Sequence, residues 1–166
     1  MMTCLNQINE RLFSKRLFYA LFIVVSLLAV NATVKTVKAE QLKVEIVKVK
    51  SAKGEYYFNT EIAKTDRERE KGLMYRQSLA RDAAMLFLWD TDRPIQMWMK
   101  NTNIPLDMVF IRSDGKIANI AHKTIPHSRR LLSSKGQVRA VLELSAGTAE
   151  KIGLAEGNRV FHRVFK

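Results

Sequence analysis

Short apolar runs separated by frequent turn signals are the feature that most restricts the fold of residues 40–166. About eight segments show either apolar alternation or the continuous apolar run of a buried β-strand. These segments are residues 42–49, 55–63, 84–89, 95–100, 106–112, 116–122, 138–144 and 159–164. Most connections are short. Because a parallel crossover needs a dozen residues or more, short connections favour antiparallel pairing.

Helical signals are confined to two places. Thr65 and Glu68 have the spacing of a capping box, and Gly72 supplies a stop for the short helix between them. Ser145 can cap a second short helix that ends at Gly153. The sequence therefore predicts a single α+β domain over residues 40–166, built on a mostly antiparallel, curved or barrel-like sheet.

The N-terminal region has a different composition. Arg11, Lys15 and Arg16 precede the apolar run 17–30, and small residues lead up to Ala39. This order is typical of a secretory signal peptide over residues 1–39. The run spans roughly 21 Å as a helix, less than the ~30 Å of a bilayer core, so cleavage is favoured. The alternative is an uncleaved inner-membrane anchor with the domain facing the periplasm.

Cleavage would change the chemistry available to the chain. Removing residues 1–39 lowers the formal net charge from +12 to +8 and removes Cys4, the only cysteine. The mature domain would have no disulfide, thiolate–metal site or thiol nucleophile. We expect a periplasmic or extracellular monomer that meets the membrane only through its N-terminal segment. Export also argues against nucleic acid as the partner of the basic surface.

No common catalytic or cofactor motif is present. The sequence has no nucleophile elbow, Walker loop, dinucleotide glycine fingerprint or zinc-protease motif. We therefore expect no cofactor, and catalysis is not favoured. Residues 124–137 form a long basic segment that we expect to be a loop.

The segment 97–107 has the densest group of chemically informative side chains. On a strand, Trp98 and Lys100 would share one face, and Met97 and Met99 the other. The two thioethers could bind copper(I), since sulfur is a soft ligand, although methionine is also common core filler.

Two carboxylates fall in apolar runs. Asp107 needs partners there, and Lys100, Asn101 or Arg76 could supply them. The result would be either an ion pair that fixes the turn or a pocket that includes Trp98. Glu143 shares a strand face with Arg139 and Val141. Nothing in the sequence brings Asp107 and Glu143 to the separation that acid/base hydrolysis needs.

Several blocks together resemble one known family. They are residues 72–76, 85–87, 98–102, 104–107, 141–144 and 146–147. In this order they are similar to the domain of unknown function 192 family, from about residue 43 to 164. The resemblance implies an N-terminal signal or membrane segment and a β-rich α+β fold, but no reaction. The polar positions that match are Arg76, Lys100, Asn101, Asp107 and Glu143. Ala84, Asn158 and the loop 124–132 depart from the family pattern.

Three functional hypotheses follow. The first is a non-enzymatic module that holds a polar or anionic envelope ligand near Trp98, Lys100, Asn101 and Arg76. The alternative is a hydrolase or lyase of envelope polymers, with Asp107 and either Glu143 or Lys100 as acid/base groups. The third is periplasmic copper(I) binding through Met97 and Met99.

Overall fold

The computed structural model describes residues 41–165. The expected signal peptide or anchor over residues 1–39 lies outside these residues, as does Cys4. None of the helices in residues 41–165 is long and apolar enough to cross a membrane.

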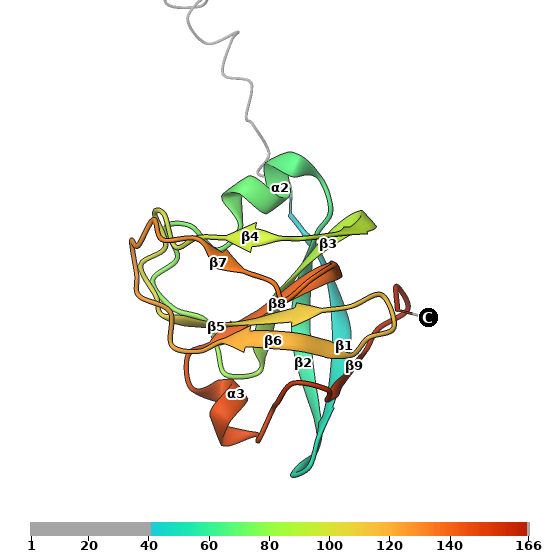
Figure 1. The fold of residues 1–166 in the computed structure, drawn as a ribbon. Coiled ribbons are helices and arrows are strands. Elements are labelled where there is room, and N and C mark those ends of the chain that lie inside the picture. Colours follow the sequence, from blue (N-terminus) through green and yellow to red (C-terminus); the bar gives the residue numbers. More distant parts are fainter. Residues whose placement is uncertain (1–40, 166) are drawn as a thin grey trace, which may run out of the picture. The chain divides into compact units, whose positions relative to one another are not determined.

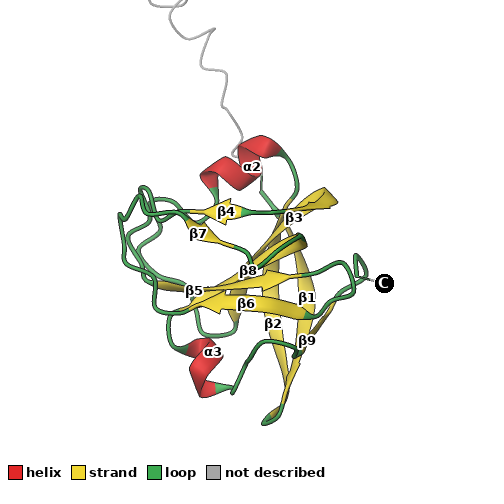
Figure 2. Ribbon diagram, viewed as in Figure 1, coloured by secondary structure: helices red, strands yellow, loops and turns green. Residues whose placement is uncertain are grey.

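The described residues form an α+β domain with nine strands and two short helices (Figures 1 and 2). The strands are β1 (Lys43–Ser51), β2 (Gly54–Ala63), β3 (Ala83–Arg93), β4 (Gln96–Met97), β5 (Leu106–Ile111), β6 (Ile117–Ala121), β7 (Leu132–Ser133), β8 (Val138–Ser145) and β9 (Arg159–Phe161). The helices are α2 (Asp66–Lys71) and α3 (Thr148–Lys151). The predicted fold class is confirmed.

Seven strands form one sheet in the order β6-β5-β8-β3-β2-β1-β9, and β4 pairs with β7 as a separate ribbon. All neighbours in the large sheet are antiparallel except β2 and β3. Residues 64–82, which include α2, make the parallel crossover between those two strands.

The two edge strands of the large sheet meet. The backbone N–H of Ile117 donates to the carbonyl of Asn158 at 2.9 Å, and the N–H of Val160 donates to the carbonyl of Gly115 at 2.8 Å. These bonds join the β5–β6 hairpin to β9, so the sheet curls into a barrel-like form. Exposed strand edges invite pairing with other chains, and this closure protects them.

The curled sheet has a buried cluster on each face. The first cluster takes side chains from every strand of the large sheet, including Val47, Leu86 and Leu142, so it fills the interior. Ala149 and Ile152, from the α3 region, pack against one end of it. The second cluster lies on the outer face of β3, β8 and β5. The β4–β7 ribbon and the loops around it cover that face (Figure 1).

Helix α2 begins and ends where the sequence predicts. The Thr65 hydroxyl accepts the Glu68 N–H at 3.2 Å, and the Glu68 carboxylate accepts the Thr65 N–H at 2.8 Å, which completes the capping box. Gly72 ends the helix at a φ of 43°, a value that favours glycine.

Four local predictions are wrong. The turn expected at 90–94 is strand, because β3 continues through an irregularity to Arg93. The strand expected over 95–100 keeps only Gln96–Met97, because its partner is the two-residue β7. That partner itself lies inside the expected loop 124–137. Ser145 does not cap α3: Gly147 occupies the N-cap position and makes no side-chain cap bond.

Candidate functional site

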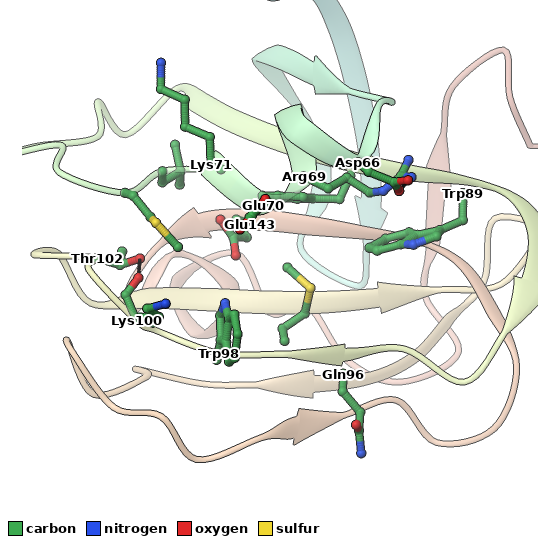
Figure 3. Close-up of a pocket in the computed structure, with 15 residues that line it drawn as sticks. Asp66, Arg69, Glu70, Lys71, Trp89, Gln96, Trp98, Lys100, Thr102 and Glu143 are labelled. Atoms are coloured by element: carbon green, nitrogen blue, oxygen red, sulfur yellow. Dashed lines mark hydrogen bonds and ion pairs between the residues drawn. The ribbon is translucent and has the colours of Figure 1, made fainter.

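An open hollow of about 390 Å³, here called the main hollow, lies between α2 and the segment 96–102 (Figure 3). Its apolar walls come mainly from two tryptophans, two methionines and a phenylalanine, and its polar groups are mostly on α2 or at residues 100–102. The lining residues are Asp66, Arg69, Glu70, Lys71, Gly72, Leu73, Met74, Phe87, Trp89, Gln96, Met97, Trp98, Lys100, Thr102 and Glu143. Small-molecule sites commonly have this volume and this mixture of apolar walls and few polar groups.

Glu143 is the buried acid of the main hollow. Strand β8 places it between Met85 of β3 and Met108 of β5, both fully buried. Only 4% of Glu143 is exposed, and its carboxyl makes no hydrogen bond or ion pair with another described residue. Burial raises the pKa of Glu143 to about 8, so the carboxyl is mainly neutral at pH 7.

Trp98 and Lys100 lie beside each other where they line the main hollow, although residues 98–100 are not strand as the sequence predicts. The Lys100 ammonium is 5.5 Å from the centre of the Trp98 ring, a cation–π distance. Trp98 is 45% exposed, an unusual position for a tryptophan in a small domain. Figure 3 shows the Glu143 carboxyl facing the space between α2 and Trp98.

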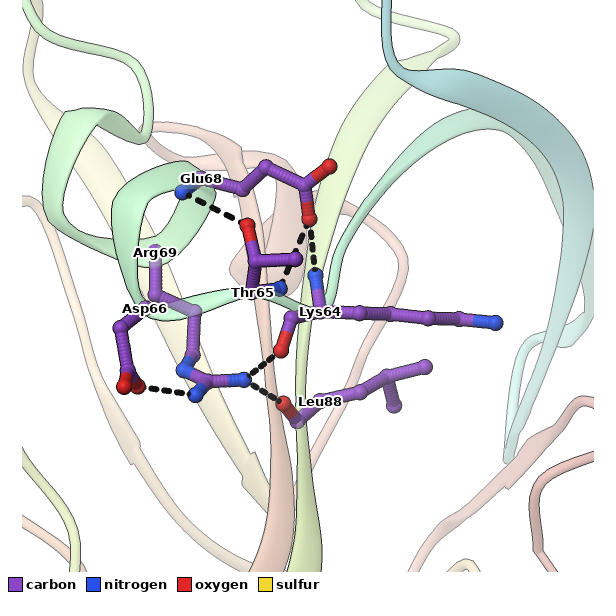
Figure 4. Close-up of polar contacts among 6 residues, drawn as sticks. All are labelled: Lys64, Thr65, Asp66, Glu68, Arg69 and Leu88. Atoms are coloured by element: carbon purple, nitrogen blue, oxygen red, sulfur yellow. Dashed lines mark hydrogen bonds and ion pairs between the residues drawn. The ribbon is translucent and has the colours of Figure 1, made fainter.

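Helix α2 forms the opposite rim, and its cations are not equally available. Arg69 donates to the carbonyls of Leu88, at 2.6 Å, and of Lys64, and it pairs with Asp66 (Figure 4). Its guanidinium also stacks 5.2 Å from the Trp89 ring. Arg69 is therefore a fixed part of the wall. Lys71 extends away from Glu143 (Figure 3).

Arg76 and Asn101 are two of the polar residues that match the family pattern, but they do not line the main hollow. Arg76 makes a two-pronged ion pair with Glu61, at 2.5 and 2.7 Å. The Asn101 amide donates to the Tyr75 hydroxyl at 2.9 Å, and the Tyr75 N–H donates to the Asn101 carbonyl at 2.9 Å. Both Asn101 and Tyr75 have positive φ, of 58° and 64°. Asn101 thus holds the loop that carries Lys100, and it reaches the site only through that loop.

Asp107 lies on the interior face of the sheet, away from Glu143. It is fully buried, and its carboxylate accepts the backbone N–H groups of Lys123 at 2.8 Å and Ala149 at 2.9 Å. These N–H groups, and not Lys100, Asn101 or Arg76, are its partners. Asp107 therefore ties α3 and residue 123 to β5, and it does not form an acid/base pair with Glu143.

The methionines expected to bind copper(I) are separated by the fold. Met97 lines the main hollow, whereas Met99 is 1% exposed in the core, with the Thr124 hydroxyl 3.1 Å from its sulfur. Residues 41–165 contain no group of three or more His, Asp or Glu side chains placed to hold a metal ion.

Several site residues have no clear sequence signal. Trp89 sits after a predicted strand and Arg69 in a predicted helix, where nothing distinguishes them from structural residues. The family-like block 72–76 does include Met74, which lines the hollow beside Gly72. That block therefore indicates the α2 side of the site in the sequence.

Known proteins resemble this chain over nearly the whole described domain. The DUF192 family, described as "Uncharacterized ACR", matches residues 47–162. A crystal structure of a "putative transcription regulator" from Sinorhizobium meliloti 1021 is 43% identical, with a TM-score of 0.71, covering 73% of this chain and 95% of that one. A crystal structure of a protein of unknown function from Novosphingobium aromaticivorans DSM 12444 is 34% identical, with a TM-score of 0.73. The match covers 75% of this chain and 89% of that one. Among curated proteins, none matches the chain.

Proposed function

Because the chain belongs to the domain of unknown function 192 family, which is uncharacterised, we propose its activity from the main hollow alone. We propose that the domain is a non-enzymatic binding module for a polar or anionic ligand. The observation that carries this proposal is the unpartnered Glu143 carboxyl, buried at an open hollow that both tryptophans of the chain line.

The described protein supplies no hydrogen-bond partner for the carboxyl, which faces the open main hollow. A ligand group in the hollow could therefore hydrogen-bond to it in place of solvent. In its neutral form Glu143 both donates and accepts, so it suits a hydroxyl or carbonyl group. Such a ligand would place its polar end at Glu143.

Lys100 and Trp98 supply the second and third contacts. Lys100 forms no ion pair with a described residue, so its charge is available to an anionic group. The exposed ring of Trp98 offers an apolar surface to the body of the ligand. Together they favour a compact molecule with an acidic group, an apolar face and a hydroxyl or carbonyl.

We place this ligand in the cell envelope. The support is the sequence of residues 1–39, in which a basic patch and a short apolar run precede Ala39. The name of the S. meliloti relative suggests contact with nucleic acid instead. We do not extend it to this chain, because α2 has six residues and α3 four, too short to serve as a recognition helix.

The test is a titration of the full-length protein with benzoate, glutarate and galacturonate, followed by tryptophan fluorescence. Both tryptophans line the main hollow, so a ligand there changes the emission directly. We expect Lys100→Gln to weaken binding roughly tenfold, the loss of one charge-assisted contact. Glu143→Leu should weaken it by a similar factor, because the polar partner is removed.

Lys50→Gln is the matched control. Lys50 is exposed on β1 and forms no ion pair with a described residue, so its loss changes the net charge by the same amount as Lys100→Gln. Equal weakening by both lysine variants would reduce the effect to general electrostatics and contradict a site at the main hollow.

Acid/base chemistry at the same hollow is the second candidate. Glu143 and Lys100 both line it, and burial brings the pKa of Glu143 to about 8, near the pH at which many enzymes work. This candidate predicts that the protein releases reducing ends or unsaturated products from polygalacturonate and that Glu143→Gln abolishes the release. Binding without product formation would eliminate it.

A further inference from the structure

A second hollow adjoins the main one. It has a volume of about 430 Å³ and is lined by Trp89, Arg93, Pro94, Ile95, Gln96, Ser133 and Ser134. Trp89 and Gln96 line both hollows, so the two lie side by side along the segment that joins β3 to β4. Figure 3 shows the Gln96 amide pointing away from Glu143. A ligand longer than the main hollow could therefore continue past Trp89 and Gln96.

The second hollow offers neutral hydrogen-bonding groups. Gln96 and Ser133 are directly opposite in the β4–β7 ribbon, and both are exposed. The side chains of these two residues make no hydrogen bond to another described residue, in contrast to Ser134, which accepts the Ile95 N–H at 3.0 Å and donates to the Gly136 carbonyl at 2.7 Å. Gln96 and Ser133 are donors and acceptors without charge, as is Glu143 of the main hollow in its neutral form.

The charges along this path are few and slightly positive. The main hollow has three cationic side chains, Arg69, Lys71 and Lys100. Its acidic side chains are Asp66, Glu70 and Glu143, of which Glu143 is mainly neutral at pH 7. Arg93 is the only charged side chain of the second hollow, and it forms no ion pair with a described residue. A densely charged polymer needs a cation for nearly every phosphate it buries, which this path does not provide.

We propose that the two hollows together bind an acidic oligosaccharide, a chain of sugars with carboxylates at intervals. The exposed Trp98 ring suits the apolar face of a sugar ring, and the neutral groups of the two hollows suit sugar hydroxyls. Lys100 in the main hollow and Arg93 in the second suit carboxylates on different sugars. This inference rests on the proposed function, since it names the ligand class of the main hollow and extends the site beyond it.

The experiment compares galacturonic acid with its trimer and hexamer, using the full-length protein and tryptophan fluorescence with calorimetry as a second readout. We expect the hexamer to bind at least roughly tenfold more tightly than the monomer, because linked contacts add without a new association cost. Arg93→Gln and Ser133→Ala should reduce the gain with length, because both residues line the second hollow only. Both should leave monomer affinity unchanged, since the monomer occupies the main hollow. Lys50→Gln is again the control.

Three outcomes separate the two proposals. A gain with length that Arg93→Gln removes supports the oligosaccharide. Equal affinity for monomer and hexamer overturns the oligosaccharide but leaves small-ligand binding at the main hollow standing. No response to any acid of any length overturns both. A neutral hexamer such as cellohexaose that binds as tightly as the acidic one would overturn the assignment to acidic sugars.

Discussion

A single carboxyl, Glu143, determines much of what the outer face of the sheet can do. Its two strand neighbours are buried methionines, and no cation or N–H group of the described residues approaches it. Asp107 is equally buried but accepts two backbone N–H groups. The carboxylate of Asp107 therefore has a structural role on one face, whereas the carboxyl of Glu143 faces an open hollow on the other.

Glu143 should make the stability of the domain depend on pH. Its pKa is about 8 in the folded chain, against an ordinary value of 4.5. Between these values the folded chain holds a proton that the unfolded chain releases. The free energy of unfolding therefore falls as pH rises through this window, by roughly 1 kcal/mol per pH unit. Glu143→Gln removes this contribution.

Urea unfolding of the wild type and Glu143→Gln at about pH 5, 6, 7 and 8 measures the effect. The difference between the two proteins cancels the titration of the histidines and other acids, which both share. We expect the wild type to lose stability relative to the variant as pH rises. If the free energies of unfolding of the two proteins change equally with pH, Glu143 is ionised in the folded domain.

The sequence predicted the strand face of Glu143, but it predicted neither the face of Asp107 nor the partners of that carboxylate. Strand alternation correctly put Glu143 with Val141 and away from Leu142. The N–H groups that satisfy Asp107 belong to residues 123 and 149, which the fold brings to β5 from later in the chain. Such partners have no local signal, because they depend on the pairing of β5 with β6 and β8.

At the scale of elements, α2 is the part of the site that the sequence defines best. The capping box and Gly72 fix both ends of the helix locally, so no distant contact is needed to predict it. The segment 95–100 is the opposite case. Its strand ends after Met97, because the partner is short and the Met99 N–H donates to the carbonyl of Ser128 instead. That bond arises from a loop more than twenty residues away.

The cap of α2 should contribute to both stability and binding. Thr65→Ala removes the hydroxyl that accepts the Glu68 N–H and should cost about 1 kcal/mol in urea unfolding. The first turn carries Asp66 and Arg69, which form one wall of the main hollow. We therefore expect Thr65→Ala also to weaken the change in tryptophan fluorescence when ligand is added.

Thr91→Ala is the control for this change. Thr91 is exposed on β3, and its hydroxyl makes no hydrogen bond to a described residue, so its loss should cost a few tenths of a kcal/mol. If the two variants unfold at the same urea concentration, the capping box does not stabilise α2 as the geometry implies.

For the whole molecule, closure of the sheet is the feature that short-range patterns could not show. The alternation and turns indicate a curved, mainly antiparallel sheet, but they do not say which edges meet. They also did not predict that β2 and β3 run parallel. The crossover of residues 64–82 has only a six-residue helix, and its remainder is irregular. Closure joins the β5–β6 hairpin to β9, so it links stability to contacts that are far apart in sequence.

Gly115 tests this closure directly. It has a φ of 80°, and a Cβ added there would lie 2.6 Å from the Val160 carbonyl oxygen of β9. Gly136 has nearly the same φ, 77°, with nothing within 4 Å of an added Cβ. Alanine at either position incurs the cost of a left-handed backbone, about 1–2 kcal/mol. Only Gly115→Ala also forces β9 away from the β5–β6 hairpin, at a further cost of about 1–3 kcal/mol.

We expect Gly115→Ala to unfold at a clearly lower urea concentration than Gly136→Ala, and to expose the β9 amides to hydrogen exchange. Equal stability of the two variants would mean that the contact between the sheet edges contributes nothing to the fold.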